Sequence, residues 1–324
     1  KSKRRNMPYH IKILLVGAGN MSQAYFKVLK ALEITPTVLC RSENTAQKFF
    51  DETGGQAISG GLNNWLEKNT LDESWKVIIA TPVEVLYDNI IELLNHGAKD
   101  ILVEKPGFIS SAEGQNIIEL AQKHQAKVHI GYNRRFYASV YALEDFIQKD
   151  GGLQSVQFEF TEWGHVIEKI EKGPKVKEHW FLANSTHVVD LVFFIAGIPV
   201  DYNFNTSGGL SWHPSASVFV GSGKTDKNVM FSYASNWEAP GRWAIEFMTN
   251  QHRLYLKPME KLNIQVKGSV AVNEFKIDDS LDIEFKPGIY KMVESFLEND
   301  YSRLVPIAKQ AEFLNIYNEM ANYQ

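Results

Sequence analysis

The first half of the chain alternates continuous apolar runs with segments that carry apolar residues at helical spacing. The run Ile11–Val16 is typical of a strand covered on both faces, because neither face of such a strand meets water. The same pattern predicts strands at 37–40, 77–80, 101–103 and 128–130, and helices at 20–32, 44–52, 83–95 and 111–124. Repeated strand–helix units of this length predict a doubly wound parallel sheet with right-handed crossovers.

The period of the hydrophobic pattern changes after about residue 150. Residues Val156–Phe160 alternate apolar and polar positions, as in a strand with one face in water. Similar runs predict strands at 217–220, 229–233, 243–248, 253–256 and 262–266, and helical spacing predicts helices at 186–196, 288–297 and 308–323. The second half is therefore predicted to be an α+β domain with an open, mostly antiparallel sheet.

Length and composition agree with two domains. The chain has 324 residues, and domains commonly hold about 150 residues. We expect a first domain over residues 7–135 and a second over 136–324, whose last helices can pack back on the first. The single cysteine, Cys40, excludes an internal disulfide framework and fits a reducing compartment, so a cytoplasmic location is expected.

Charge and known motifs exclude several classes of partner. A formal net charge of −4 gives no reason to expect a nucleic-acid or membrane partner. The basic start Lys1–Arg5 is interpreted as a frayed or vector-derived end, with a nucleic-acid arm as the alternative, and no targeting segment is expected. No His-Glu-x-x-His pattern occurs, so no metal site is predicted.

A glycine turn joins the first strand to the first helix, where dinucleotides bind in sheets of this kind. Its residues are Gly17, Ala18, Gly19, Asn20 and Met21. The glycines allow a tight turn and a close approach of the backbone to a pyrophosphate, and the helix N-terminus offers free N–H groups. Ser22 stands where a third glycine is usual, which weakens the match. In this context the turn predicts a nicotinamide dinucleotide site.

The end of the second strand bears on the choice between NAD and NADP. An acidic residue there binds the ribose of NAD, whereas an Arg accommodates the 2′-phosphate of NADP. Arg41 and Ser42 come first, and both can bind a phosphate. Glu43 is the alternative for NAD, but its charge also suits the first turn of the next helix. We therefore predict NADP, with NAD possible.

Glu104, Lys105 and Pro106 follow the strand at 101–103. Ligands of open α/β sheets bind at the carboxyl ends of the strands. A partly desolvated Lys at such a position has a lowered pKa and can exchange a proton with a substrate hydroxyl. Taken alone, a Lys in a loop is usually a solvated charge. The proton-transfer role is predicted for Lys105 because it directly follows a buried strand.

Five segments of the chain form a recognisable set: the turn Gly17-Ala18-Gly19, Ala80-Thr81-Pro82, Glu104-Lys105-Pro106, Gly131-Tyr132-Asn133-Arg134-Arg135-Phe136, and Thr186-His187 with Asp190-Leu191. Through these segments the sequence resembles the glucose–fructose oxidoreductase/inositol dehydrogenase (Gfo/Idh/MocA) family over nearly the whole chain. The resemblance implies an N-terminal NAD(P)-binding Rossmann domain and a C-terminal domain for substrate binding and oligomerisation. It also implies hydride transfer between a nicotinamide and a carbon that bears a hydroxyl or carbonyl.

The resemblance further implies roles for individual residues. Lys105 would donate or accept the proton, and His187 would act as its acid–base partner or as a hydrogen-bond donor. The cofactor would be bound by the glycine turn, Arg41, Ser42, Ala80, Thr81, Pro82, Glu104 and Lys105. The substrate, a sugar, nucleotide sugar or related polyol, would be bound by Asn133, Arg134, Asn184 and His187. Adjacent arginines suit an anionic group, although Arg135 is equally suited to a structural ion pair.

His187 also has an argument of its own. Asn184 and Ser185 precede it and are good helix caps, so it is predicted near the start of a helix. Asp190 lies three residues further on, which places both side chains on one face and lets Asp190 orient the imidazole. A lone His among apolar residues is otherwise more often a hydrogen-bonded core residue.

Two departures from the family pattern keep other functions open. Many members carry an Asp where this chain has Ala183, and a His where it has Leu86. The alternatives are a reductase of imines or conjugated systems, which needs less proton relay, and a non-catalytic NAD(P)-binding sensor. An open sheet face in the second domain would expose apolar surface in a monomer, so a homodimer or homotetramer is expected.

Overall fold

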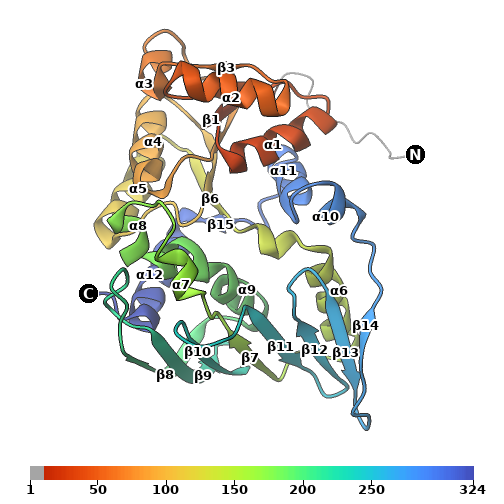
Figure 1. Cartoon of the computed structure of the whole chain (residues 1–324). Coiled ribbons are helices and arrows are strands. Elements are labelled where there is room, and N and C mark those ends of the chain that lie inside the picture. The colour runs from red at the N-terminus through yellow and green to blue at the C-terminus, as the bar shows by residue number, and fades with distance from the viewer. Residues whose placement is uncertain (1–10) are drawn as a thin grey trace. The chain divides into compact units, whose positions relative to one another are not determined.

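The structure is a computed structural model and describes residues 11–324. The expected domain start at Met7 and the basic segment Lys1–Arg5 lie outside the described residues. The chain divides into two compact units, drawn in Figure 1. The first unit ends at Tyr132 and also includes Ile289–Leu314, and the second comprises Asn133–Gly288 and Asn315–Gln324. Residues 289–314 thus make most of their contacts in the first unit.

The first unit is built on a seven-stranded sheet with the order β15-β6-β5-β4-β1-β2-β3. Its strands are β1 (Lys12–Val16), β2 (Thr37–Leu39), β3 (Ala57–Ile58), β4 (Trp75–Ile79), β5 (Asp100–Glu104), β6 (Lys127–Gly131) and β15 (Val305–Pro306). All neighbours pair in parallel except β15, which runs antiparallel to β6. The predicted doubly wound parallel sheet is confirmed. Its strand order reverses between β1 and β4, where such sheets bind their ligands.

Helices connect these strands. They are α1 (Asn20–Ala31), α2 (Glu43–Thr53), α3 (Gly61–Leu66), α4 (Val83–Asn95), α5 (Ser111–Lys123) and α11 (Ile289–Leu297). Local sequence explains where several of them begin: the Ser42 hydroxyl accepts the Thr45 N–H at the start of α2, and Ser110 and Glu113 form a capping box at α5. Helix α11 returns from late in the sequence to pack beside α1.

The second unit holds an eight-stranded sheet with the order β14-β13-β12-β11-β7-β10-β9-β8. Its strands are β7 (Ser155–Glu159), β8 (Pro199–Ser207), β9 (Val218–Thr225), β10 (Met230–Asn236), β11 (Ala244–Met248), β12 (His252–Leu256), β13 (Leu262–Val266) and β14 (Val272–Phe275). Only β7 and β10 pair in parallel, so the predicted mostly antiparallel sheet is confirmed.

Both edge strands of this sheet were missing from the sequence prediction. In β8, Asp201, Asn203 and Asn205 occupy every second position and are exposed, and such residues are depleted in strands generally. In β14 all four residues are exposed, so no apolar alternation marks the strand. An edge strand needs only one partner, and its side chains can remain in water.

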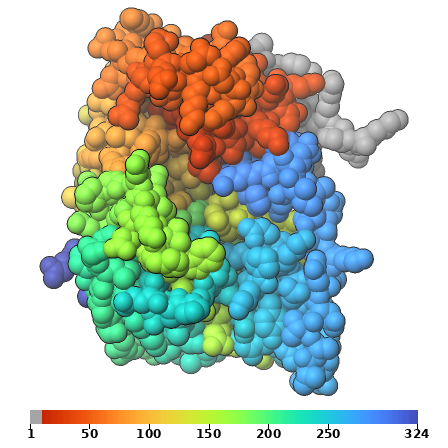
Figure 2. Space-filling model, viewed as in Figure 1, coloured from red at the N-terminus to blue at the C-terminus, as the bar shows by residue number. Residues whose placement is uncertain are grey.

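The remaining elements of the second unit are mostly short. They are the 3-10 turn η1 (Asn133–Phe136), α6 (Ala138–Lys149), α7 (Gly164–Ile167), α8 (Pro174–Glu178), the π-helical turn η2 (Phe181–Ser185), α9 (Thr186–Ala196) and α10 (Ser280–Glu284). The final helix, α12 (Ile307–Ala321), contributes residues to both units. Figure 2 shows the yellow-green α7–α8 segment on the surface of the second unit. Within residues 11–324, no helix has the length and hydrophobicity that a membrane crossing requires.

Candidate active site

The glycine turn lies at the carboxyl end of β1, against the end of β4. Gly17 has φ +111°, and a Cβ built on it would lie 2.5 Å from the Ala80 carbonyl oxygen. Ser22, at the third-glycine position, is fully buried and donates from Oγ to the same oxygen at 3.3 Å. The serine therefore replaces the glycine without opening the packing between α1 and β4, because its hydroxyl has an acceptor there.

Gly19 differs from Gly17 in its surroundings. Its φ of −84° and ψ of −166° are extended values that any residue adopts, and a Cβ built on it would meet no atom within 4 Å. Neither the backbone nor the packing of the protein thus requires glycine there. The open space lies in front of the first N–H groups of α1, where a pyrophosphate is attracted by both free donors and the helix dipole. The turn therefore fits a dinucleotide.

The end of β2 places three candidate residues at the start of α2. Arg41 is exposed, and Ser42 is the N-cap of α2. Glu43 lies in the first turn of the helix, as predicted, where it accepts a hydrogen bond from Ser59. Cys40 is buried, and desolvation raises the pKa of its thiol, which makes it a packing residue rather than a nucleophile.

The end of β5 holds Lys105 between two anchored residues. The Tyr25 hydroxyl from α1 donates to Glu104, and burial and the nearby Glu104 carboxylate raise the pKa of that phenol. On the other side, Gln310 from α12 donates to the Pro106 carbonyl at 3.1 Å and to the Tyr132 hydroxyl at 2.9 Å. Lys105 itself is half-buried. Sequence reasoning missed Gln310, which lies about 200 residues away and in no motif.

The segment after β4 forms another part of the same edge. Ala80 donates its N–H to the Val16 carbonyl at 2.9 Å, Thr81 accepts at Oγ1 from Asn89 at 2.9 Å, and Pro82 is the N-cap of α4. The first unit thus brings the predicted cofactor residues of the glycine turn, the β4 end and the β5 end to one edge of its sheet.

In the second unit, His187 is buried in the first turn of α9 and lies with its ring 5.9 Å from that of Trp243. The predicted caps before it are wrong. Residues Phe181–Ser185 continue the helix backwards as a π-helical turn, and Ser185 has helical φ and ψ with no side-chain capping bond. The Asn184 and Ser185 side chains instead donate to Glu162. Turns of this kind are frequent at functional sites.

Asp190 forms a buried ion pair with Arg135. Its two carboxylate oxygens accept from Arg135 Nε at 2.8 Å and Arg135 Nη2 at 2.7 Å. Both residues are buried, and α9 is thereby joined to η1. Burial raises the pKa of Asp190 and the Arg135 charge opposes this rise. Both oxygens of Asp190 thus bind Arg135, a partner that the sequence did not indicate.

The two substrate candidates of η1 have unequal surroundings. Asn133 is buried, donates to the Pro287 carbonyl at 2.9 Å and accepts from Arg134 at 3.0 Å, so both ends of its amide are engaged. Arg134 is half-buried, and its guanidinium carbon lies 5.2 Å from the centre of the Trp243 ring. The Arg134 Nε is buried and has no hydrogen-bond partner among the described residues.

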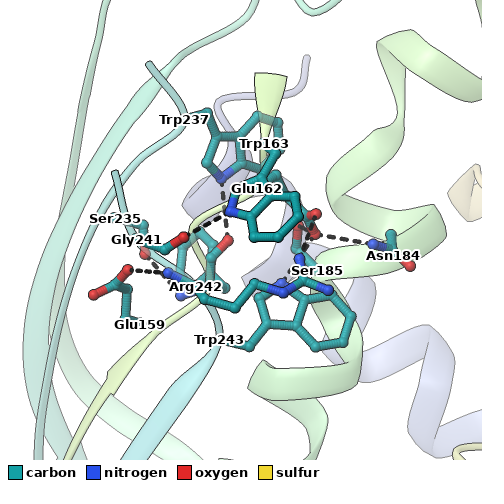
Figure 3. A network of polar contacts seen from close by, with 11 residues as sticks. Glu159, Glu162, Trp163, Asn184, Ser185, Ser235, Trp237, Gly241, Arg242 and Trp243 are labelled. Carbon is teal, nitrogen blue, oxygen red and sulfur yellow. Dashed lines mark hydrogen bonds and ion pairs between the residues drawn. The ribbon is translucent and has the colours of Figure 1, made fainter. Parts of the chain in front are cut away.

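Glu162 is a buried acidic residue that the sequence analysis did not single out. Its Oε1 accepts from Asn184 at 3.0 Å, Ser185 at 3.0 Å and Trp243 Nε1 at 3.2 Å (Figure 3). Burial raises the pKa of this carboxyl, and the hydrogen bonds from Ser185 and Asn184 oppose the rise. No local pattern could have revealed the cluster, because its members come from three separate parts of the chain.

A second buried polar cluster lies at the amino ends of the first unit's strands. Lys76 of β4 and Tyr301 both bind Asp100, the first residue of β5. His129 of β6 stacks on Tyr301 with ring centres 4.6 Å apart, and burial lowers the pKa of His129 to about 4. Desolvation also lowers the pKa of Lys76. Within residues 11–324, no group of three potential ligands is arranged to hold a metal ion.

Comparison with known proteins was made for sequence and for structure. Residues 11–132 match the model of the Gfo/Idh/MocA oxidoreductase family, described as an NAD-binding Rossmann fold. The rhizopine catabolism protein MocA of Rhizobium meliloti is 25% identical over 134 residues. That match spans 41% of this chain and 41% of the relative.

Several solved structures share the fold of nearly the whole chain. A protein from Desulfitobacterium hafniense that is named as an NADPH-dependent oxidoreductase superposes with TM-score 0.79 at 14% identity, covering 97% of this chain and 95% of its own. UDP-N-acetylglucosamine 3-dehydrogenase GnnA from Acidithiobacillus ferrooxidans gives 0.73 at 14%, with 97% of each chain covered. The WlbA dehydrogenase from Chromobacterium violaceum, in complex with NADH and UDP-GlcNAcA, gives 0.70 at 16%, covering 97% and 93%.

The match and the shared fold define the class of protein that the chain resembles: residues 11–132 match oxidoreductases with an NAD-binding Rossmann fold. The resemblance to the Gfo/Idh/MocA family is confirmed, and residues 11–132 are the part that matches the family model.

Proposed function

We propose that the protein transfers hydride between NADP and a sugar, nucleotide sugar or related polyol, with Lys105 moving the hydroxyl proton. The observation that carries the proposal is the open space in front of Gly19, at the same sheet edge as the Lys105 loop. A glycine that neither backbone nor packing requires is explained by a ligand that approaches the backbone closely. When bound, the nicotinamide supplies or accepts the hydride.

The surroundings of Lys105 suit a group that moves a proton. The Glu104 side chain is held by Tyr25 and the Pro106 carbonyl by Gln310, so the residues on both sides of Lys105 are anchored. A general acid or base must be held within hydrogen-bond reach of the proton that it transfers, and anchoring reduces the cost of holding it there. In the second unit we assign His187 the role of acid–base partner or hydrogen-bond donor, with Asn133, Arg134 and Asn184 as further substrate residues.

The preference for NADP rests on Arg41, which is exposed next to the N-cap Ser42. A guanidinium at this position can pair with a 2′-phosphate, while Glu43 is already engaged by Ser59. We expect Arg41→Ala to weaken NADPH about tenfold or more and to change NADH affinity about twofold at most. Titration of both cofactors by nicotinamide fluorescence tests this, and equal losses for both would remove the assignment of Arg41.

The substrate class is supported by the relatives of known activity. GnnA acts on UDP-N-acetylglucosamine, and the WlbA structure contains UDP-GlcNAcA. The test is a panel of sugars, polyols and nucleotide sugars, run with NADP and NAD in both directions while the absorbance of the reduced nicotinamide is followed. We expect turnover with a member of this panel and a preference for NADP.

A second candidate function is favoured by Ala183. Ala183 is buried and stands where many members of the family carry an Asp, so this position supplies no carboxylate for a proton relay to His187. Reduction of an imine or a conjugated system requires less proton relay than oxidation of an alcohol. Cyclic imines and conjugated carbonyl compounds therefore belong in the panel. Turnover of these alone would select the second function, and cofactor binding without turnover of any compound would select a sensor.

The oligomeric state and the location of the protein are also proposals. Val220 and Met230 are 48% and 57% exposed on β9 and β10 of the second sheet. We propose a cytoplasmic homodimer or homotetramer in which this apolar surface is covered. Light scattering at micromolar concentration tests the association, and a monodisperse monomer would refute it.

A further inference from the structure

Arg242 is a cation whose position is fixed by two aromatic rings. Its guanidinium carbon lies 5.0 Å from the ring centre of Trp163 and 5.0 Å from that of Trp243 (Figure 3). The peptide group that precedes it is also held, since Trp163 Nε1 donates to the Gly241 carbonyl at 2.8 Å and the Arg242 N–H donates to Glu159 at 3.1 Å. Arg242 is therefore ordered before any ligand arrives.

Within residues 11–324, no protein acceptor forms a hydrogen bond with this guanidinium. Stacking on aromatic rings occupies the faces of a guanidinium and leaves its in-plane N–H groups available. The nearest carboxylate oxygen is Glu162 Oε2, at 4.0 Å from Arg242 Nη1, which is beyond hydrogen-bond distance. The side chain is also 52% exposed, so a ligand can reach it. An ordered, stacked arginine with free donors is suited to binding an anion.

A second arginine converges on the same indole. Arg134 lies 5.2 Å from the Trp243 ring centre, and its buried Nε has no hydrogen-bond partner among the described residues. The Trp243 ring is itself held by its hydrogen bond to Glu162 and lies beside His187. One indole thus connects a residue already assigned to the substrate, Arg134, with Arg242, which no sequence pattern indicated.

The same part of the second unit has room for the rest of a ligand. Trp163 also lines a surface pocket of about 560 Å³, together with Trp237, Glu168 and Glu238. This volume lies in the usual range for small-molecule sites. Indole faces and carboxylates are suited to the apolar faces and hydroxyl groups of a sugar, whereas an anionic group would be repelled by the carboxylates and attracted to Arg242.

We propose that Arg242, stacked between Trp163 and Trp243, binds an anionic group of the substrate, a phosphate or a carboxylate, and so selects anionic sugar derivatives over neutral ones. This inference rests on the proposed function, because it names the substrate class of that oxidoreductase. Glu162 is a positioning residue in it, since it fixes the Trp243 indole and faces Arg242. Charge-assisted hydrogen bonds to an ordered guanidinium supply the selectivity.

The test measures anion binding with the glycine turn kept occupied by saturating NADP, because that turn is itself proposed to bind a pyrophosphate. UDP, inorganic pyrophosphate and glucuronate are titrated calorimetrically into the full-length protein at low and high salt, with UDP and pyrophosphate representing a phosphate and glucuronate a carboxylate. We expect at least one probe to bind, and Arg242→Gln to weaken it about tenfold or more. Arg242→Lys keeps the charge but loses the planar fork, so it should restore only part of the affinity.

A matched control is available in the same unit. Arg253 also lies over an aromatic ring, Tyr255, at 5.8 Å, but its guanidinium is already bound to Glu246. Arg253→Gln removes the same charge and should change the affinity about twofold at most. The proposal is overturned if no probe binds the wild-type protein, if Arg242→Gln binds like wild type, or if Arg253→Gln loses as much. Failure of the proposed function would appear separately, as absence of NADP and NAD binding or of turnover.

Discussion

The two edges of the first unit's sheet carry opposite kinds of chemistry. At the carboxyl edge, glycines and small residues leave space in front of α1, and the one cation of the β5 end, Lys105, is half-buried. At the amino edge, Lys76 and Asp100 are packed together with Tyr301, on which His129 from the middle of β6 stacks. The carboxyl edge is built to admit a ligand, and the amino edge is built to exclude water.

This comparison shows that a shifted pKa does not by itself mark an active site. The pKa of His129 is lowered to about 4 and that of Lys76 is lowered as well, yet neither lies at the carboxyl ends of the strands, where doubly wound sheets bind their ligands. Their shifts are explained by burial within a structural cluster. The carboxyl edge is recognised by its free backbone donors and its open space instead.

The largest effect is expected for Lys105, the lysine at the carboxyl edge of the sheet. We expect Lys105→Ala to lower the turnover number about 10²- to 10⁴-fold while NADPH affinity stays within about threefold, because a general acid or base acts on the chemical step. Steady-state kinetics and a fluorescence titration measure the two quantities. Turnover equal to that of the wild type would remove Lys105 from the mechanism.

The lysine of the amino edge should affect stability and not chemistry. Lys76→Met leaves the Asp100 carboxylate in a poorly solvated position without its cation, which costs about 3–5 kcal/mol of unfolding free energy when a buried pair is broken. Urea denaturation measures this loss. The folded variant should keep its turnover number, and a large drop in turnover at unchanged stability would contradict the contrast between the edges.

The stability of the protein should also depend on pH through His129. Its pKa is about 4 in the folded state and 6.5 in the reference state, so the unfolded chain binds the proton more readily. The stabilisation is complete above pH 6.5 and is lost as the pH falls towards 4, by about 2 kcal/mol between pH 6.5 and 5. His129→Phe keeps the ring on Tyr301 and should remove that part of the slope in urea denaturation. An unchanged slope would show that His129 does not carry it.

The smallest effect concerns the anchor of the Lys105 loop. Gln310→Met is close in shape but lacks the amide that holds the Pro106 carbonyl and the Tyr132 hydroxyl. We expect the turnover number to fall by about tenfold at most, because Lys105 is less well held but still present. The pH profile of turnover should keep its shape. A loss as large as that of Lys105→Ala would assign Gln310 a direct chemical role.

The sequence predicts helices and strands that show a regular pattern of apolar residues along the chain. It does not predict contacts between residues that are far apart in the sequence. The runs at 77–79 and 101–103 are strands because their apolar side chains are covered on both faces, and helices 83–95 and 186–196 have the predicted bounds. The edge strands β8 and β14 were not predicted, because each has a neighbouring strand on one side only and many of their side chains are exposed to water. The return of residues 289–314 to the first unit has no local signal.

The same distinction applies to the candidate site. The glycine turn and the Glu104–Pro106 segment are continuous motifs, so the sequence indicates them directly. Glu162, Arg242 and Trp243 form one cluster only after the sheet of the second unit is assembled, because β7 and β11 pair and bring residues about 80 positions apart together. The capping role of Asn184 was wrong because its helix begins one turn earlier.

The most direct test of the account uses Gly19, where the structure has room for a side chain and the proposed cofactor does not. Thermal unfolding and calorimetric titration with NADPH are carried out on Gly19→Val and on the wild-type protein. The account predicts that Gly19→Val still folds, since a Cβ meets no atom within 4 Å, with an unfolding temperature lowered by about 4 °C at most because Val is a poorer N-cap than Gly, and a loss of NADPH affinity of about 100-fold or more. Unchanged NADPH affinity in a folded Gly19→Val variant would contradict the claim that the dinucleotide binds at this edge.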